Sequence, residues 1–427
     1  MHFSGHMRHA YEFDQLGGED AAWLHMEDET NPMVVSGLLE LGGPLDFSRF
    51  TALLEGFVLS APRFRARVVE PALGVGVPHW EPDAAFALAR HVERLTLGPS
   101  EEALRGFVSR RVGGLLERDR PLWHLDVVDR GSAGTAILCR VHHAVADGFA
   151  LMGLLLSLCD EHDTETIKAV THGWSAGGVI RQAASLSRLI TLPHDPQTLL
   201  KHPLTREKRV AWSHVIPLDR VKAIARGLSA TVNDVLVAVV AGALRGYLVG
   251  HGDDVAEVRA MVPVNLREGA AAGNGLGNHF GLVILGLPVG VADPVERVAE
   301  TSRRMARLKA SPEALVALGV LRAMGWAPPQ LEDLGVAFFG KKASLVLTNL
   351  PGPREQLHLA GVPLTRLIFW VPQSARMGLG VSIFSYAHEV TLGVLTDTAV
   401  VPEPQVLVEA LEHELDVLVE RTSAALH

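Results

Sequence analysis

Two adjacent histidines followed by an aspartate and a glycine form the stretch of this sequence best suited to chemistry. The run His142-His143-Ala144-Val145-Ala146-Asp147-Gly148 lies between two apolar stretches. A neutral imidazole within hydrogen-bond reach of a hydroxyl can take its proton while the oxygen attacks an acyl carbonyl. The run is therefore a candidate for acyl transfer from a thioester to a hydroxyl, with a histidine as the general base.

The flanking residues predict how this run is held. Thr135–Val141 is typical of a buried strand and Phe149–Leu158 of a buried helix, so the histidines fall in a strand-to-helix turn. Asp147 is expected at the helix N-terminus, where a carboxylate caps backbone N–H groups. Gly148 is expected to permit a backbone path that a Cβ would obstruct. The positive end of the helix dipole would lower the pKa of a nearby histidine.

The two histidines cannot easily serve the same substrate. Successive residues of a strand point to opposite faces, so one of His142 and His143 should be catalytic and the other structural. The same geometry argues against a shared metal ion, and no third ligand stands nearby. Paired histidines are more often structural than catalytic, so the pattern alone leaves both roles open.

Composition limits the classes of partner. The chain has 427 residues, of which 48% are hydrophobic, and its formal net charge is −9. It has no run of basic residues, which argues against a nucleic-acid partner. The two cysteines, Cys139 and Cys159, lie in apolar stretches, as reduced thiols of a cytoplasmic protein do. Apolar runs such as Phe149–Cys159 are too short to span a bilayer, so we expect any work on lipid to take place from the surface.

The pattern of apolar residues predicts a mixed α/β (α+β) chain with two lobes of similar size. We place the first lobe at residues 1–165, a connecting segment at 166–210 and the second lobe at 211–427. The connecting segment contains an amphipathic helix, Val179–Leu192, that either contacts a lipid surface or packs over the lobe junction. The expected strands are 33–41, 122–128, 135–141, 258–264, 279–287, 344–347, 367–371, 380–386 and 389–395, and the expected helices are 47–57, 101–116, 148–158, 232–248, 293–308 and 403–419.

Three further polar or aromatic groups invite a functional interpretation beside a plainer one. Trp123, in Pro121-Leu122-Trp123, would line a cleft or simply pack in the core. Asn233-Asp234 at the start of a helix is most simply a capping pair, with a role in shaping the active site as the alternative. Thr348-Asn349 ends a strand before a proline-rich turn, and these polar groups could also face a developing oxyanion.

Taken in order, these groups resemble the motifs of the bacterial wax ester synthase/acyl-CoA:diacylglycerol acyltransferase family, which is part of the chloramphenicol-acetyltransferase-like superfamily. The resemblance runs nearly end to end, and one departure is His124, where we expect an acidic residue. The matching segments are 19–25, 31–34, Pro121-Leu122-Trp123, His142 to Gly148, Asn233-Asp234, 262–267, Gly277-Asn278 and Thr348 to Pro353.

The resemblance implies two chloramphenicol-acetyltransferase-like lobes with a tunnel between them. It implies that His143 is the general base and that Asp147 is a structural organiser. The substrates would be acyl-CoA and either diacylglycerol or a long-chain alcohol, with no metal and no cofactor. The protein would be cytoplasmic, and it could attach peripherally to a membrane or lipid droplet. Another thioester donor, and a non-catalytic lipid-droplet protein, remain as alternatives.

Overall fold

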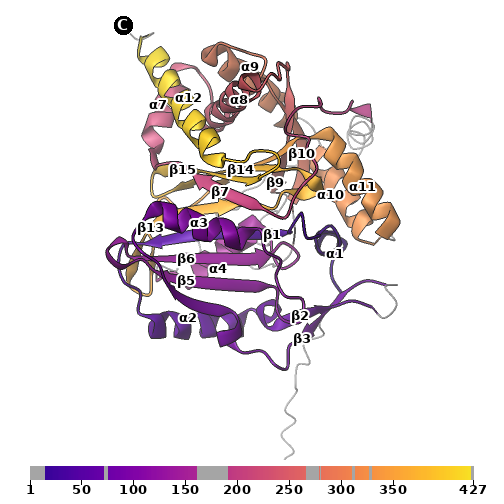
Figure 1. The fold of residues 1–427 in the computed structure, drawn as a ribbon, viewed down its shortest axis with the longest axis vertical. Coiled ribbons are helices and arrows are strands. Elements are labelled where there is room, and N and C mark those ends of the chain that lie inside the picture. The colour runs from indigo at the N-terminus through magenta and orange to yellow at the C-terminus, as the bar shows by residue number, and fades with distance from the viewer. Residues whose placement is uncertain are drawn as a thin grey trace, which may run out of the picture.

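The computed structural model describes residues 15–71, 76–160, 191–265, 278, 280–309, 313–326 and 329–424. It has two α/β lobes, with the indigo and purple N-terminal half below and most of the C-terminal half above in Figure 1. This confirms the predicted fold class. Each lobe is built on one large sheet, and a small sheet pairs β2 (Ala66–Val69) with β3 (His79–Pro82).

The first lobe is a six-stranded sheet with helices on both faces. Helices α2 (Phe47–Ser60) and α4 (Gly148–Leu158) contribute to the core on one face, and α3 (Glu101–Val112) packs on the other. Helix α1 (Gly18–His25) lies at the edge facing the second lobe. The strand order is β12 (His358–Leu359), β13 (Val362–Trp370), β1 (Val34–Leu41), β6 (Thr135–His142), β5 (Trp123–Asp129) and β4 (Val92–Thr96).

The second lobe has a seven-stranded sheet with its own apolar core. Its strands are β10 (Phe280–Leu287), β9 (Val258–Asn265), β11 (Leu345–Pro351), β14 (Leu379–Tyr386), β15 (Glu389–Asp397) and β7 (Lys208–Trp212), with β8 (Ile216–Pro217) paired to β15. Its helices are α7 (Leu218–Gly227), α8 (Val232–Gly250), α9 (Pro294–Lys309), α10 (Glu313–Gly325), α11 (Pro329–Lys342) and α12 (Pro404–Ala424). Short 3-10 turns lie at Pro62–Arg65, Leu88–Arg90, Gly131–Ala133 and Ser374–Arg376.

The lobes are not contiguous in sequence, and this amends the predicted domain limits. Strands β12 and β13 come from the C-terminal part of the chain but complete the first sheet, where β13 pairs antiparallel with β1. Strand β7 begins at Lys208, inside the predicted connecting segment, and belongs to the second sheet. Pairing partners far away in sequence leave no local signal, so the apolar pattern could not show this exchange.

The described elements that periodicity predicted are confirmed, with shifts of up to five residues at their ends. Periodicity missed helices α1, α7, α10 and α11 and the short strands β2, β3, β4, β7, β8 and β12. The predicted helix Val179–Leu192 lies almost wholly outside the described residues. Among the described helices, α8 alone is long and apolar enough to cross a membrane. In this fold 67% of its apolar window is buried, and its side chains form the centre of the second core, as the sequence predicted.

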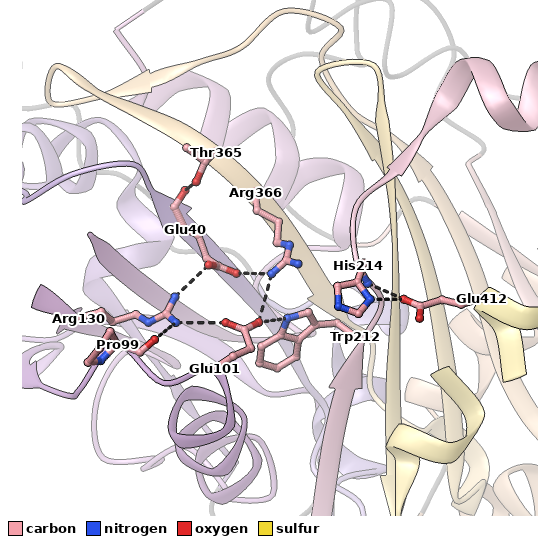
Figure 2. A network of polar contacts seen from close by, with 9 residues as sticks. All are labelled: Glu40, Pro99, Glu101, Arg130, Trp212, His214, Thr365, Arg366 and Glu412. Carbon is pink, nitrogen blue, oxygen red and sulfur yellow. Dashed lines mark hydrogen bonds and ion pairs between the residues drawn. The ribbon is translucent and has the colours of Figure 1, made fainter. Parts of the chain in front are cut away.

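A network of hydrogen bonds and ion pairs connects the two lobes where they meet (Figure 2). Glu101, in the first turn of α3, accepts hydrogen bonds from Trp212 Nε1 of β7 at 2.7 Å and from Arg366 of β13 at 3.2 Å. Arg130 contacts Glu101 at 3.2 Å and Glu40 of β1 at 3.0 Å. One network thus joins β1, α3, the crossover strand β13 and β7 of the second sheet.

Arg130 is the most buried charged member of this network, at 3% exposure, so its loss should be costly. We predict that Arg130→Met lowers the free energy of unfolding by about 1–3 kcal/mol, because two carboxylates lose a buried partner. Arg67→Met is the matched control, since Arg67 pairs with Glu81 at an exposed site. It should cost less than about 1 kcal/mol. Equal losses in urea denaturation would contradict the role given to the network.

Candidate active site

His143 lies in the turn between β6 and α4, where the sequence placed it. Strand β6 ends at His142 and α4 begins at Gly148. Asp147 is the N-cap of α4, and its side chain accepts a hydrogen bond from the Ala150 N–H at 2.9 Å. The backbone N–H of His143 donates to the Met33 carbonyl at 2.7 Å, which ties the turn to the start of β1.

The His143 ring is held by Asn278, which stands just before β10 of the second lobe. His143 Nδ1 lies 2.7 Å from Asn278 Oδ1. The Asn278 amide nitrogen donates in the other direction, to the His143 carbonyl at 2.7 Å and to Asp20 Oδ1 at 2.8 Å. The β6–α4 turn of one lobe is therefore hydrogen-bonded to a side chain of the other.

This arrangement selects one tautomer of the imidazole. Both Asn278 Nδ2 contacts are to acceptor oxygens, so the amide cannot be turned to present nitrogen to His143 without losing them. Its Oδ1 must then accept a hydrogen bond, and Nδ1 of His143 is the nitrogen that carries the proton. Nε2 is left as the ring nitrogen that can accept a proton from a substrate.

Asp20 of α1 holds Asn278 in place through hydrogen bonds. Its Oδ1 accepts from both the side chain and the backbone N–H of Asn278, at 2.8 and 3.1 Å. Its Oδ2 pairs with Arg63 at 3.1 Å, and Arg63 also donates to the Val145 carbonyl in the catalytic turn. Burial raises the pKa of the Asp20 carboxyl, although the attraction of Arg63 and the Asn278 hydrogen bonds act against it.

The indole of Trp23 covers the His143 ring. The rings stack with centroids 4.1 Å apart and planes 15° apart, and Phe280 contacts His143 at 5.5 Å. Helix α1, which carries Asp20 and Trp23, is seated closely against α10. A Cβ on Gly325 would lie 1.7 Å from the Gly18 carbonyl oxygen, so only glycine permits this approach.

This enclosure keeps His143 neutral. Loss of water lowers the pKa of His143 from 6.5 to about 4, and the charge of Asp147 and the hydrogen bond to Asn278 oppose the change only in part. The sequence predicted a lowered pKa but attributed it to the helix N-terminus. Burial by Trp23 and Phe280 is the larger cause.

His142 points to a different environment, as strand alternation predicted. Its Nδ1 accepts from the Ala144 N–H at 3.0 Å, within the turn itself. Its Nε2 lies 3.4 Å from Oε1 of Glu27, which also accepts from the Met33 N–H. Burial alone would raise the pKa of Glu27, but contact with His142 and the Met33 hydrogen bond outweigh it, so the pKa is lowered. His142 braces the turn from the other side.

An apolar cavity begins beside the catalytic turn and runs under the first sheet. It is lined by the cavity-facing residues of β1, β5, β6 and β13, by α2 and α4, and by Leu350 of β11. Gly148 and Val141 lie at its end nearest His143.

The backbone of Gly148 does not require glycine, which corrects the sequence expectation. A Cβ there would meet Leu350 Cδ1 at 3.1 Å, so the constraint is space.

The segment Pro121-Leu122-Trp123 forms part of the wall of this cavity or packs next to it. Trp123 is buried and lines the cavity, and its Nε1 donates to the Phe64 carbonyl at 2.8 Å, so both interpretations of Trp123 hold. The Leu122 carbonyl accepts from the His142 N–H at 2.9 Å, and Pro121 begins the segment. His124 points to the opposite face of the sheet, toward Asp126.

The remaining motif residues lie on the second lobe. Asn349 Nδ2 donates to Asn233 Oδ1 at 2.7 Å, which joins β11 to the start of α8. Asp234 forms a capping box with Thr231, as the plainer interpretation expected, and also accepts from Ser302. Thr348 is buried and shares its strand face with Leu350, because both lie two residues apart on β11. An oxyanion role for Thr348 or Asn349 stays a prediction.

One group of potential metal ligands occurs among the described residues, away from His143. Glu93, His124 and Asp126 bring ligand atoms within 4.8 Å of one another. The guanidinium of Arg111 already lies against two of them, 2.6 Å from Glu93 and 3.1 Å from Asp126. Arg111 supplies the positive charge that these carboxylates require.

The sequence of the chain matches a known protein family. The wax ester synthase/diacylglycerol acyltransferase catalytic-domain model matches residues 16–175, and the C-terminal-domain model of the same family matches residues 276–419. The chain belongs to this family. A candidate diacylglycerol O-acyltransferase of Mycobacterium tuberculosis is 27% identical over 457 residues, covering 93% of this chain and 90% of that one. These relatives indicate an acyltransferase of the diacylglycerol and wax ester type.

Solved structures agree on the fold. The wax ester synthase/diacylglycerol acyltransferase from Marinobacter aquaeolei VT8 aligns with a TM-score of 0.72 at 24% identity, covering 96% of this chain and 99% of that one. The first condensation domain of the CDA synthetase aligns with a TM-score of 0.64 at 16% identity, covering 97% and 96%. The two-lobed architecture expected from the motifs is thus confirmed.

Sequence reasoning missed the residues that orient the His143 ring. Asp20, Trp23 and Asn278 entered only as members of matching segments, without roles. No spacing rule connects positions so far apart, because contact between them depends on how the lobes dock. The one available signal was a polar Asn278 directly before an apolar strand.

A general-base role for His143, which we propose below, would set the acid limit of the reaction through the lowered pKa of its ring. A base must be neutral, so kcat/KM should stay level as the pH falls below 6.5 and decline only near pH 4. Between these values the unfolded chain binds a proton that the folded site excludes, so stability decreases over the same range. Circular dichroism at each pH separates the two effects. An acid limb centred near 6.5 would contradict the buried-base account.

Proposed function

We propose that the chain transfers a fatty acyl group from acyl-CoA to diacylglycerol, to a long-chain alcohol, or to both, with His143 as the general base. The observation that carries this proposal is the Asp20–Asn278–His143 chain of hydrogen bonds. It supports a neutral imidazole with Nε2 ready to accept a proton. The apolar cavity beginning at Gly148 supports a substrate with a long hydrocarbon chain.

The proposed reaction is a direct attack. The acceptor hydroxyl gives its proton to His143 Nε2 as its oxygen forms a bond to the thioester carbonyl carbon. The tetrahedral intermediate then collapses with cleavage of the carbon–sulfur bond. The departing sulfur takes the proton back from Nε2, giving an ester and free CoA thiol. No acyl group is attached to the protein at any stage.

Two features of the site stabilise the positively charged imidazolium ring of His143 that forms during the proposed reaction. The carboxylate of Asp147 raises the pKa of His143 by its charge, so it favours the imidazolium. The Nδ1–H bond to Asn278 becomes charge-assisted and therefore stronger when the ring is protonated. Exclusion of water by Trp23 strengthens both interactions. Asp147 thus combines its capping role with an electrostatic one.

Removal of the base tests the proposal. His143→Ala should lower turnover by about 10²–10⁴-fold, which is the usual contribution of general-base help. Activity is measured as CoA release from palmitoyl-CoA, with dioleoylglycerol and hexadecanol tested side by side and the ester product identified. His214→Ala is the matched control, because His214 is an exposed histidine remote in the fold.

The outcomes are distinct. Near-normal ester formation by a folded His143→Ala protein would refute the role of His143. Activity of the wild type only with a palmitoylated carrier protein would refute acyl-CoA as the donor. The ratio of triacylglycerol to wax ester formed by the wild type assigns the acceptor.

A further inference from the structure

A glycine in the middle of a strand of the cavity wall stands where a hydrocarbon chain would have to pass. Gly37 lies in the middle of β1, between Val35 and Leu39, and all three line the cavity. Its backbone φ is not positive, so no turn or strain requires glycine there. Glycine inside a strand weakens it and often marks the close approach of a ligand.

The strand register divides this wall into three levels. Val35 pairs with Val141 nearest the catalytic turn, Gly37 pairs with Cys139 in the middle, and Leu39 pairs with Ile137 at the far end. The middle level also contains Leu125 and Phe369, which flank the Gly37–Cys139 pair in the sheet. On β1, the first and third levels carry the branched side chains of Val35 and Leu39, and only the middle level, at Gly37, has no side chain.

The space in front of Gly37 is open. A Cβ built there would have the Ile368 carbonyl oxygen as its nearest neighbour, at 3.9 Å. Gly148, by contrast, would bring a Cβ to within 3.1 Å of Leu350. A Cβ at position 37 therefore meets no close neighbour, and a larger side chain would extend into the cavity.

Cys139, the neighbour of Gly37, also belongs to this middle level. Burial and the charge of Asp126 raise the pKa of its thiol to about 12, so it stays protonated and apolar. Its side chain lines the wall and is not needed as a nucleophile. The middle of the cavity thus offers only small or apolar groups, as an alkyl chain requires.

We propose that Gly37 determines the length of hydrocarbon chain that the protein accepts, by leaving the middle of the cavity passable. The proposal rests on the acyl transfer proposed above. Cys139 lies four positions before His143, a distance of about 13 Å along an extended chain. A hexanoyl chain ends before this level, whereas a palmitoyl chain must extend past Gly37 toward Leu39. The chain is either the acyl group or the alkyl group of the acceptor.

The test compares the wild type with Gly37→Ala and Gly37→Val in four reactions, which combine hexanoyl-CoA or palmitoyl-CoA with hexanol or hexadecanol. Gly37→Val should lower kcat/KM with the long substrate at least about tenfold, and change it less than about threefold with short ones. Gly37→Ala should give a smaller effect in the same direction. Melting temperatures should equal or exceed that of the wild type, since glycine weakens a strand.

Gly153→Val is the control, because a Cβ at Gly153 of α4 meets nothing within 4 Å and Gly153 does not line the cavity. Its length preference should match the wild type. A loss that follows the donor assigns the cavity to the acyl chain, and a loss that follows the alcohol assigns it to the acceptor. An equal change in all four reactions would overturn the proposal.

A binding measurement keeps this test separate from the proposed function. Calorimetric titration with palmitoyl-CoA, hexanoyl-CoA and hexadecanol reports the cavity even if the wild type transfers no acyl group. Weaker binding of a long-chain compound by Gly37→Val, with hexanoyl-CoA binding unchanged, supports the role of Gly37. Unchanged binding of all three by a folded Gly37→Val protein would refute it.

Discussion

The hydrogen bond between His143 Nδ1 and Asn278 Oδ1 is the interaction on which the rest of the site depends. A buried imidazole can be neutral in two tautomers, and only one leaves Nε2 as a base. Asn278 selects that tautomer because its amide nitrogen is already committed to Asp20 and to the His143 carbonyl. The same residue that fixes the proton thus also fixes the turn.

This bond also depends on how the two lobes are placed against each other. His143 belongs to the first lobe, Asn278 precedes a strand of the second, and Asp20 lies on α1 between them. A shift of one lobe by a fraction of the bond length would release the ring. The crossover of β13, the contact of Gly18 with Gly325 and the hydrogen bond from Trp212 Nε1 to Glu101 oppose such a shift.

Much of this arrangement could be predicted from local sequence, and the rest could not for a physical reason. Periodicity located most helices and strands, and the strand-to-helix turn with Asp147 as its cap followed from residue types near one another. The base-orienting role of Asn278, the cover provided by Trp23 and the exchange of β13 between sheets arise from contacts between distant segments. Gly148 illustrates the limit, since the tight space around it comes from Leu350 on the other lobe and not from its own backbone.

The protonation state of the His143 ring is the most direct test of this account. Nitrogen NMR of the protein labelled in its histidine rings, with His143→Gln to assign the signal, reports which nitrogen carries hydrogen at neutral pH. The account predicts a proton on Nδ1, a bare Nε2, and no titration until the pH approaches about 4. In Asn278→Leu the preference for that tautomer should be lost. A wild-type ring protonated at Nε2, or one that titrates near 6.5, would contradict the central claim.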